Sequence, residues 1–308
     1  MIRLDDFLTA DDAADSIPLG GGFLLVNDAT SGPIIQVTAL ADTGACGLAS
    51  PVTVDARLDA NALAWITRSG VAPSHRLCSL DQVHGSTCAA ADEGESTELV
   101  PAHCSSCGAP LDPASSICPY CSTPVKPMAL ARLAGTDAVW TRSPDDVLIV
   151  RTADCAAVWL ADPEHAHIAL VHAGWRGAAD GIVQHAVDTL VEQGAHRDFI
   201  VAAIGPHIGR CCFEVGPEVA SHFADIEGAI SPPSVLTAPR MRTDSVSLNL
   251  GAVLAAQLHT AGLPSDAIAL ATACTRCFRA PDGTHALHSY RRNGSGGPLM
   301  GSIAFLEQ

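Results

Sequence analysis

Residues 147–177, VLIVRTADCAAVWLADPEHAHIALVHAGWRG, decide the fold of this chain. Short apolar runs rich in β-branched residues at 147–150, 156–160 and 168–171 are bounded by turn-forming residues, which is the pattern of buried strands. The runs 147–150 and 156–160 form one apolar segment that Cys155 interrupts, and His172 closes the second segment, 168–171. If the two strands are neighbours, the short turn between them lets thiol and imidazole converge. Such groups are zinc or copper ligands, or a nucleophile and its base.

The composition indicates a globular protein with metal-binding thiols. The 308 residues are 48% hydrophobic, which is enough for one large core or two modest ones. The net charge of −16 without a basic cluster argues against nucleic acid as the main partner. The sequence shows neither a signal peptide nor a membrane-spanning run, so we expect a cytoplasmic protein without a membrane partner. In a reducing compartment, its 12 cysteines are expected to bind metal rather than form disulfides.

Residues 99–128 differ from the rest in composition, with few aliphatic residues and many Pro, Ser and Cys. We predict that they are inserted into a core formed by 1–98 and 129–308. The insertion carries two C-x-x-C pairs, formed by Cys104, Cys107, Cys118 and Cys121. Four thiolates complete a closed tetrahedral zinc site, and the metal replaces a hydrophobic core that about 25 residues cannot build. With no open position, this zinc ribbon is predicted to serve structure or contact with a protein partner.

Outside the insertion, the patterns predict a mixed α/β fold without a regular βαβ repeat. Periodicity predicts helices at these ranges: 59–69, 178–193 and 248–262. Strands are predicted at the following further ranges: 22–26, 34–39, 77–88, 200–204, 268–273 and 302–306. The strand at 77–88 carries D-Q-V-H-G, in which Gly85 permits a bend that presents His84. His84 is therefore a candidate third ligand beside Cys155 and His172.

Six motifs follow one another along the chain: D-Q-V-H-G, T-A-D-C, H-A-G-W-R-G, I-G-P-H-I-G-R-C-C-F-E-V-G, C-T-R-C and S-Y-R-R-N-G. In this order they resemble the YfiH-like laccase-domain family, also called the multicopper polyphenol oxidoreductase family, over residues 77–90 and 133–306. The four-cysteine insertion is not part of that family pattern. The resemblance implies a mixed α+β sandwich with a single zinc, or alternatively copper, held by His84, Cys155 and His172. Three protein ligands leave a fourth position for water or substrate.

The same resemblance implies activity on purine nucleosides, either with phosphate as purine nucleoside or methylthioadenosine phosphorylase, or as adenosine deaminase. Older descriptions of the family imply a copper-dependent polyphenol oxidase. The chain lacks two arginines of the family pattern, since Ala62 follows Asn61 and Pro298 follows Gly297. Whether phosphorolysis is retained therefore stays open.

Further polar residues near these motifs are candidate substrate ligands. Arg176 precedes the predicted helix, where a guanidinium beside a helix N-terminus suits an anion, although a surface pair with Asp180 explains it equally well. Asp154 is predicted to orient a ligand or a substrate hydroxyl, or to serve as a turn residue. Arg291 and Arg292 are predicted to bind phosphate, unless they are simply solvated.

The remaining cysteine pairs are predicted to be structural. Cys211 and Cys212 are adjacent, so a bond between them would be strained, and we expect them to line the site near Glu214. Cys274 and Cys277 form a C-x-x-C without a partner pair in the sequence, which favours packing over a metal or redox role.

Two other functions stay open beside the nucleoside enzyme. Cys155 with His172 or His84 as its base fits a cysteine hydrolase, for example one acting on cell-wall precursors. A non-catalytic metal-binding or partner-binding protein built around the four-cysteine insertion is the third alternative.

Overall fold

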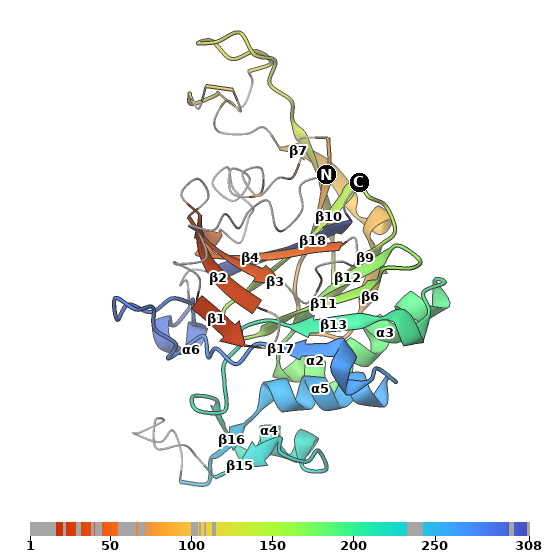
Figure 1. The fold of residues 1–308 in the computed structure, drawn as a ribbon, viewed down its shortest axis with the longest axis vertical. Helices are drawn as coiled ribbons and strands as arrows, with labels where there is room; N and C mark the ends of the chain where they lie inside the picture. The colour runs from red at the N-terminus through yellow and green to blue at the C-terminus, as the bar shows by residue number, and fades with distance from the viewer. Residues whose placement is uncertain are drawn as a thin grey trace.

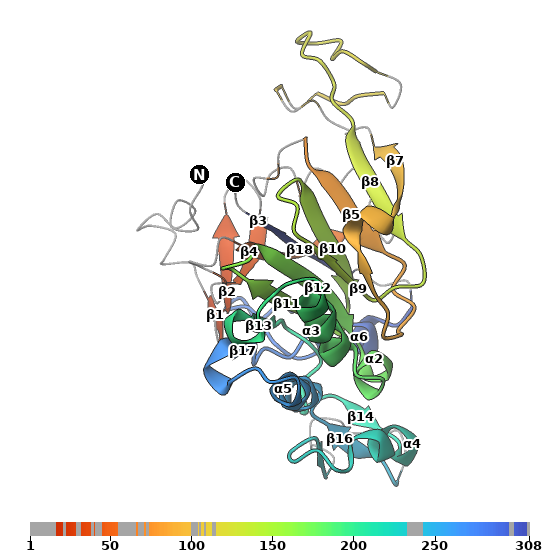
Figure 2. The same cartoon turned by 90° about the vertical axis from the view of Figure 1, so that its right-hand side faces the viewer.

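Two mixed β-sheets face each other, and helices cover the smaller sheet in the computed structural model (Figures 1 and 2). The structure describes residues 17–20, 23–28, 32–37, 40, 45–54, 66, 71, 74–99, 104, 106–107, 109–112, 115–232, 243–295 and 299–306. Among these residues, no helix combines the length and apolar character that a membrane crossing needs. The mixed α/β class predicted from the sequence is confirmed.

The larger sheet, as described, has the strand order β1-β2-β3-β4-β18-β10-β5-β8-β7. Its strands have the following bounds: β1 (Ile17–Gly20), β2 (Phe23–Asp28), β3 (Gly32–Val37), β4 (Ala45–Val54), β5 (Arg76–Leu80), β7 (Glu95–Leu99), β8 (Met128–Leu133), β10 (Asp146–Thr152) and β18 (Leu299–Leu306). Strand β18 runs antiparallel to both β4 and β10. It thereby joins the first strands of the chain to the middle of the sheet.

The smaller sheet has the order β17-β13-β11-β12-β9-β6 among the described residues. Its strands have these bounds: β6 (Cys88–Ala90), β9 (Ala138–Thr141), β11 (Ala156–Asp162), β12 (His167–Ala173), β13 (Val201–Ile204) and β17 (Ile268–Leu270). Three short strands form a separate sheet: β14 (Glu214–Val215), β15 (Ile230–Ser231) and β16 (Val246–Leu248).

The helices follow or connect these strands, and α3 lies over the smaller sheet in Figure 2. The α-helices have these bounds: α2 (Trp175–Ala179), α3 (Ile182–Glu192), α4 (Pro217–Ala220), α5 (Leu250–Thr260) and α6 (Tyr290–Asn293). The 3-10 helices are η4 (Ala91–Glu93), η5 (Arg197–Phe199), η6 (Ser221–Phe223) and η8 (Ser265–Ala267).

Strand β11 is apolar throughout because both of its faces are covered. Ala157 and Trp159 belong to the core between the two sheets, whereas Val158 and Leu160 pack in the core shared with α3 and α5. Alternating side chains of a strand point to opposite faces, so a strand between two layers needs apolar residues at every position. The predicted pairing of β11 with β12 is confirmed, with Ala157 opposite His172.

The apolar segment that contains Cys155 is divided between the two sheets. Strand β10 belongs to the larger sheet and β11 to the smaller one, so residues 153–155 cross from one sheet to the other. Cys155 thus lies at this crossing rather than within a continuous strand. The T-A-D-C motif therefore lies where the chain changes layers.

Two other predicted elements differ from the structure. The predicted strand at 77–88 is confirmed only up to Leu80, where β5 ends, because the D-Q-V-H-G segment is a loop in which Gln82 and His84 have φ of 60° and 64°. These positive φ angles are incompatible with a strand. The predicted helix at 178–193 begins earlier and is split into α2 and α3 at Gly181, whose φ is 76°.

Predictions for the remaining segments match the described strands and helices where the structure covers them. The predicted strands at 22–26 and 34–39 correspond to β2 and β3, and the helix at 248–262 corresponds to α5. Asn249 caps α5 by accepting a hydrogen bond from the Ala252 N–H. The predicted helix at 59–69 lies outside the described residues except for Ile66, which is helical and buried.

The described part of the insertion lies between β7 and β8, which pair antiparallel at one edge of the larger sheet. In Figures 1 and 2 it extends beyond the end of this strand pair. The division into a core and a ribbon at 99–128 stays a prediction.

Trp159 joins the two sheets, and its replacement tests the role of this contact. The ring is 1% exposed, and Nε1–H donates to the Ile303 carbonyl of β18 at 2.9 Å. Trp159→Phe removes the donor and leaves a space, so we expect the free energy of unfolding in urea to fall by about 1–3 kcal/mol. Trp140→Phe, at a half-buried ring, is the control, and an equal loss in both variants would contradict this role.

Candidate metal site and pocket

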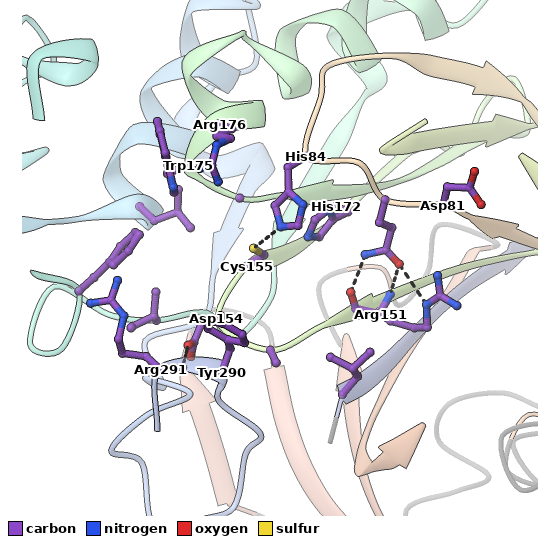
Figure 3. A pocket seen from close by; sticks show the side chains of 17 residues that line it. Asp81, His84, Arg151, Asp154, Cys155, His172, Trp175, Arg176, Tyr290 and Arg291 are labelled. Carbon is purple, nitrogen blue, oxygen red and sulfur yellow. Dashed lines mark hydrogen bonds between the residues drawn. The ribbon is translucent and has the colours of Figure 1, made fainter. Parts of the chain in front are cut away.

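The structure brings His84, Cys155 and His172 together from three segments. Their ligand atoms lie within 4.8 Å of one another, and His84 Nε2 is 3.9 Å from Cys155 Sγ. The loop after β5 supplies His84, the sheet crossing supplies Cys155, and β12 supplies His172. Figure 3 shows the three side chains directed toward one point. Two imidazoles and one thiol form a donor set that suits zinc or copper and leaves room for a further ligand.

Asp137 orients both histidines, and the sequence alone did not single it out. The carboxylate is fully buried and accepts Nδ1–H of His172 at 2.7 Å and the backbone N–H groups of His84 and Gly85 at 3.0 and 2.7 Å. Because Nδ1 of His172 is occupied, Nε2 is the nitrogen left to bind a metal. Burial opposes ionisation of Asp137, but the bond from His172 and the two N–H groups keep its pKa below the ordinary value.

Two glycines of H-A-G-W-R-G allow the segments to approach closely. A Cβ atom at Gly174 would lie 2.8 Å from Cys155 Sγ and 3.2 Å from His84 Cδ2. A Cβ atom at Gly177 would lie 2.8 Å from the carbonyl oxygen of Gly85. Any side chain at these positions would displace a ligand or the loop that carries His84.

Cys155 and His172 stabilise each other in their charged forms. Burial opposes ionisation of both groups, but the attraction between thiolate and imidazolium and their hydrogen bond outweigh it. The pKa of Cys155 is lowered to about 6, and that of His172 is raised to about 9. The thiol is therefore largely a thiolate at neutral pH, which is the form that binds metal.

His84, Cys155 and His172 line a pocket of about 590 Å³. Three arginines line it, namely Arg151, Arg176 and Arg291, together with the aromatic residues Trp175, Phe213 and Tyr290. Arg151 is buried, and its guanidinium donates to the Leu80 carbonyl at 2.7 Å and to Gln82 Oε1 at 3.3 Å. Arg151 and Gln82 were not predicted as site residues. The sequence signal that could have pointed to Arg151 is a charged side chain that directly follows the apolar run 147–150.

Arg176 and Arg291 both line the pocket, as predicted for substrate ligands. The exposed Arg176 guanidinium lies 4.4 Å from the centre of the Trp175 ring, and α2 begins at Trp175 rather than after the arginine. Arg291 donates from its side chain to the Glu214 carbonyl at 2.9 Å and lies over Phe213. The positive groups are placed around the pocket, which suits an anionic substrate.

Asp154 and Arg292 have positions that favour support of the pocket over direct contact with substrate. Asp154 lines the pocket, but its carboxylate accepts Thr275 Oγ1–H and the backbone N–H of Arg291, both at 2.6 Å. Its φ of 93° is a strained conformation for a residue with a side chain. The Arg292 guanidinium lies away from this pocket and donates to backbone carbonyls, including that of Thr275 at 3.0 Å.

The predicted position of Cys211 and Cys212 beside the pocket differs from the structure. Among residues 211–214, only Phe213 is part of the described pocket lining. Glu214 is buried and accepts a hydrogen bond from the Ser245 hydroxyl.

The four cysteines of the insertion also come together. The sulfur atoms of Cys104, Cys107, Cys118 and Cys121 lie within 4.8 Å of one another. The shortest pairs are 3.5 Å for Cys104 with Cys121 and 3.7 Å for Cys107 with Cys118. This geometry is compatible with the predicted tetrahedral site.

Comparison with known proteins assigns the family. The family model described as "Multi-copper polyphenol oxidoreductase laccase" matches residues 53–306, and the chain belongs to this family. The pocket-lining residues lie within the bounds of this match.

Curated relatives carry the names of purine nucleoside enzymes. Adenosine deaminase RL5 from an unknown prokaryotic organism is 37% identical over 147 residues, which cover 48% of this chain and 55% of the relative. A purine nucleoside phosphorylase of Bacteroides thetaiotaomicron is 37% identical over 147 residues, which cover 46% and 52%. The chain thus spans about half the length of these relatives.

Solved structures share the fold. YlmD from Geobacillus stearothermophilus superposes with a TM-score of 0.64 at 20% identity, covering 89% of this chain and 96% of that one. Bacillus licheniformis hypothetical protein YfiH gives a TM-score of 0.62 at 22% identity, covering 93% and 97%. The mixed α/β arrangement around the pocket is therefore that of the YfiH and YlmD structures.

Asp137→Asn tests whether this carboxylate prepares the metal ligands. An amide keeps the shape but cannot accept all three N–H groups, so the His172 tautomer and the His84 loop lose their support. We expect the zinc affinity of the core site to fall about 10- to 100-fold, measured by competition with a chelator. Asp188→Asn, at a side chain that is 54% exposed, is the control. Equal affinity in wild type and Asp137→Asn would show that Asp137 has no such role.

Proposed function

We propose that this chain is a metal-dependent purine nucleoside enzyme. It would cleave adenosine, inosine or methylthioadenosine with phosphate, deaminate adenosine, or do both. The observation that carries the proposal is the presence of the His84, Cys155 and His172 donor set and three arginines in one pocket. Its volume of about 590 Å³ suits a small molecule of this size. The names of the curated relatives support the same activity class.

The residues of this chain divide the work of binding and reaction. His84, Cys155 and His172 would hold zinc or copper, which would supply a Lewis acid beside the substrate. Asp137 fixes the tautomer of His172, and Gly174 keeps space for the Cys155 sulfur. The aromatic residues of the pocket offer faces against which a purine can stack.

Phosphate would bind to one or more of the arginines that line the pocket. Arg151 and Arg291 are braced by backbone carbonyls, which gives their charges fixed positions. Arg176 is exposed and held over Trp175, so its guanidinium is the one best placed to meet an incoming anion. Ala62 and Pro298, which stand where the family pattern has arginines, lie outside the described residues. In their place, Arg151, Arg176 and Arg291 would supply the positive charge that phosphorolysis needs.

Assays with and without phosphate test this proposal. Zinc-loaded protein is expected to release hypoxanthine from inosine only with phosphate, or to form inosine from adenosine without it, as detected by chromatography. His84→Ala should lose zinc from the core site and both activities. If the wild-type protein converts none of the three nucleosides under either condition, the proposal is wrong. Copper-loaded protein assayed with a phenol tests the activity that the family description names.

Arg176→Met tests the phosphate site separately from the metal. Removing a charge-assisted hydrogen bond costs about 1.5–3 kcal/mol, so kcat/KM for phosphate should fall about 10- to 100-fold. Adenosine deamination and zinc content should change much less. Arg142→Met, at an exposed arginine outside the described lining of this pocket, should behave like wild type. An equal loss of both activities in Arg176→Met would argue against a role in phosphate binding.

Cys155 beside two imidazoles also fits a second function, that of a cysteine hydrolase acting on cell-wall precursors. The two functions differ in their need for metal. A chelated, metal-free protein that hydrolyses such precursors and loses activity on alkylation of Cys155 would establish the hydrolase and contradict the metal-dependent enzyme.

For the insertion, we propose a structural zinc held by Cys104, Cys107, Cys118 and Cys121. The variant Cys107→Ser/Cys121→Ser should contain one zinc fewer than wild type, measured by mass spectrometry of the elements, and should keep its turnover of nucleosides. Loss of turnover without loss of zinc would contradict this assignment. Pull-downs with the same variant would show whether the ribbon contacts a protein partner.

A further inference from the structure

A second group of four cysteines gathers in two loops that also contribute to the wall or support of the pocket. Cys211 and Cys212 lie in the loop between β13 and β14, and Cys274 and Cys277 lie in the C-T-R-C segment after β17. The sulfur atoms of all four lie within 4.8 Å of one another. The sequence separates the two pairs, and the parallel pairing of β13 with β17 brings the two loops to the same edge of the smaller sheet.

The sulfur spacing matches that of a tetrathiolate metal site. Zinc bound by four thiolates at about 2.3 Å places the sulfur atoms about 3.8 Å apart. Cys211 and Cys277 are 3.6 Å apart, close to the 3.5 and 3.7 Å of the shortest pairs in the insertion. All four are free thiols, whereas disulfide-bonded sulfur atoms are about 2.05 Å apart.

The backbone around Cys274 is folded as it is around Cys104 in the predicted ribbon. The N–H groups of the second and third residues after Cys274, Arg276 and Cys277, donate to its sulfur, and so does Gly209 at 3.2 Å. In the insertion, Ser106 and Cys107 donate in the same way to Cys104. The backbone N–H groups around Cys274 are thus directed at its sulfur, as they are at Cys104.

We propose that Cys211, Cys212, Cys274 and Cys277 hold a zinc ion in a closed, four-coordinate site. The four thiolates fill the coordination shell, so the site is structural and separate from the His84, Cys155 and His172 site. Any cysteine still protonated releases its proton when zinc binds. No oxidation or reduction is involved.

The charge of the surroundings suits such a site. Zinc with four thiolates carries a net charge of −2, which needs compensation in a partly buried position. A cavity of about 340 Å³ beside the cluster is lined by Cys212 and Cys277 and by three arginines, Arg276, Arg279 and Arg292. The position of Arg292 is thereby explained, because its guanidinium also holds the C-T-R-C turn through the carbonyls of Thr275 and Arg276.

The proposed zinc would fix two loops that carry walls of the pocket. Thr275 lies between the two cysteines of C-T-R-C and donates to Asp154, the neighbour of Cys155, at 2.6 Å. Phe213 directly follows the Cys211–Cys212 pair and lines the pocket. A zinc ion that links these two loops would therefore stabilise the positions of Phe213 and Asp154 in the pocket wall.

Metal content tests the proposal without reference to nucleoside turnover. Full-length protein is purified with zinc under reducing conditions, and its zinc is measured by mass spectrometry of the elements. Cys211→Ser/Cys277→Ser should contain one zinc fewer than wild type, and this loss should add to that of Cys107→Ser/Cys121→Ser. Cys88→Ser, at a half-buried cysteine outside the cluster, should keep the wild-type content. Wild-type zinc content in a folded Cys211→Ser/Cys277→Ser variant would overturn the proposal.

Thiol protection in the wild-type protein gives an answer even if the variants do not fold. Cys277 is exposed, so as a free thiol it should react rapidly with iodoacetamide. We expect peptide mass spectrometry to show that Cys211 and Cys277 react at least tenfold more slowly in zinc-loaded protein than after treatment with a chelator. Equal rates before and after chelation would overturn the proposal, and so would a Cys211–Cys277 disulfide in protein purified under reducing conditions.

Discussion

The buried carboxylate of Asp137 is the interaction on which the candidate active site depends. It lies at the start of β9 and binds the ring of His172 in β12 and the backbone at His84 and Gly85 in the loop after β5. Three hydrogen bonds from two segments hold the charge, and a buried carboxylate with fewer partners would be costly. The spacing of the two imidazoles is therefore set by the fold, before any metal binds.

The crossing of the chain between the two sheets places the third ligand. Strand β10 ends in the larger sheet with Arg151 and Thr152, and β11 starts in the smaller sheet at Ala156, so the half-buried Cys155 lies where the chain crosses between the layers. The backbone is strained there, with positive φ at Asp154 and, across the opening, at Gln82 and His84. Strained residues persist where their surroundings hold them, and Asp154 is held by Thr275 and Arg291. The same carboxylate thus links the metal ligand to the wall of the pocket.

The convergence of Cys155 and His172 could be predicted from the sequence because each of them interrupts or ends a strongly apolar run. The strand pair around them followed from the same pattern, and the regular C-x-x-C spacing pointed to the grouping of the four cysteines in the insertion. Asp137 and Arg151 could not be predicted as site residues, because their contacts arise between segments that are far apart in the sequence. The split of the helix after Arg176 depends on one glycine with positive φ, which has the same appearance in sequence as any other glycine. The proximity of Cys211 to Cys274 could not be predicted either, because it depends on the parallel pairing of β13 with β17.

Net charge distinguishes the metal sites proposed for the three cysteine-containing clusters. A divalent ion with one thiolate and two neutral imidazoles keeps a net charge of +1, and three arginines face the same pocket as His84, Cys155 and His172. A divalent ion with four thiolates has a net charge of −2 and no open position. Around Cys211 and Cys274, arginines neutralise that charge rather than recruit a ligand. In a chain with a net charge of −16, the three arginines of the proposed His84, Cys155 and His172 site would favour an anionic substrate there. In the proposed assignment, the number of thiolates therefore separates a metal site that leaves a position for substrate from two sites that are closed.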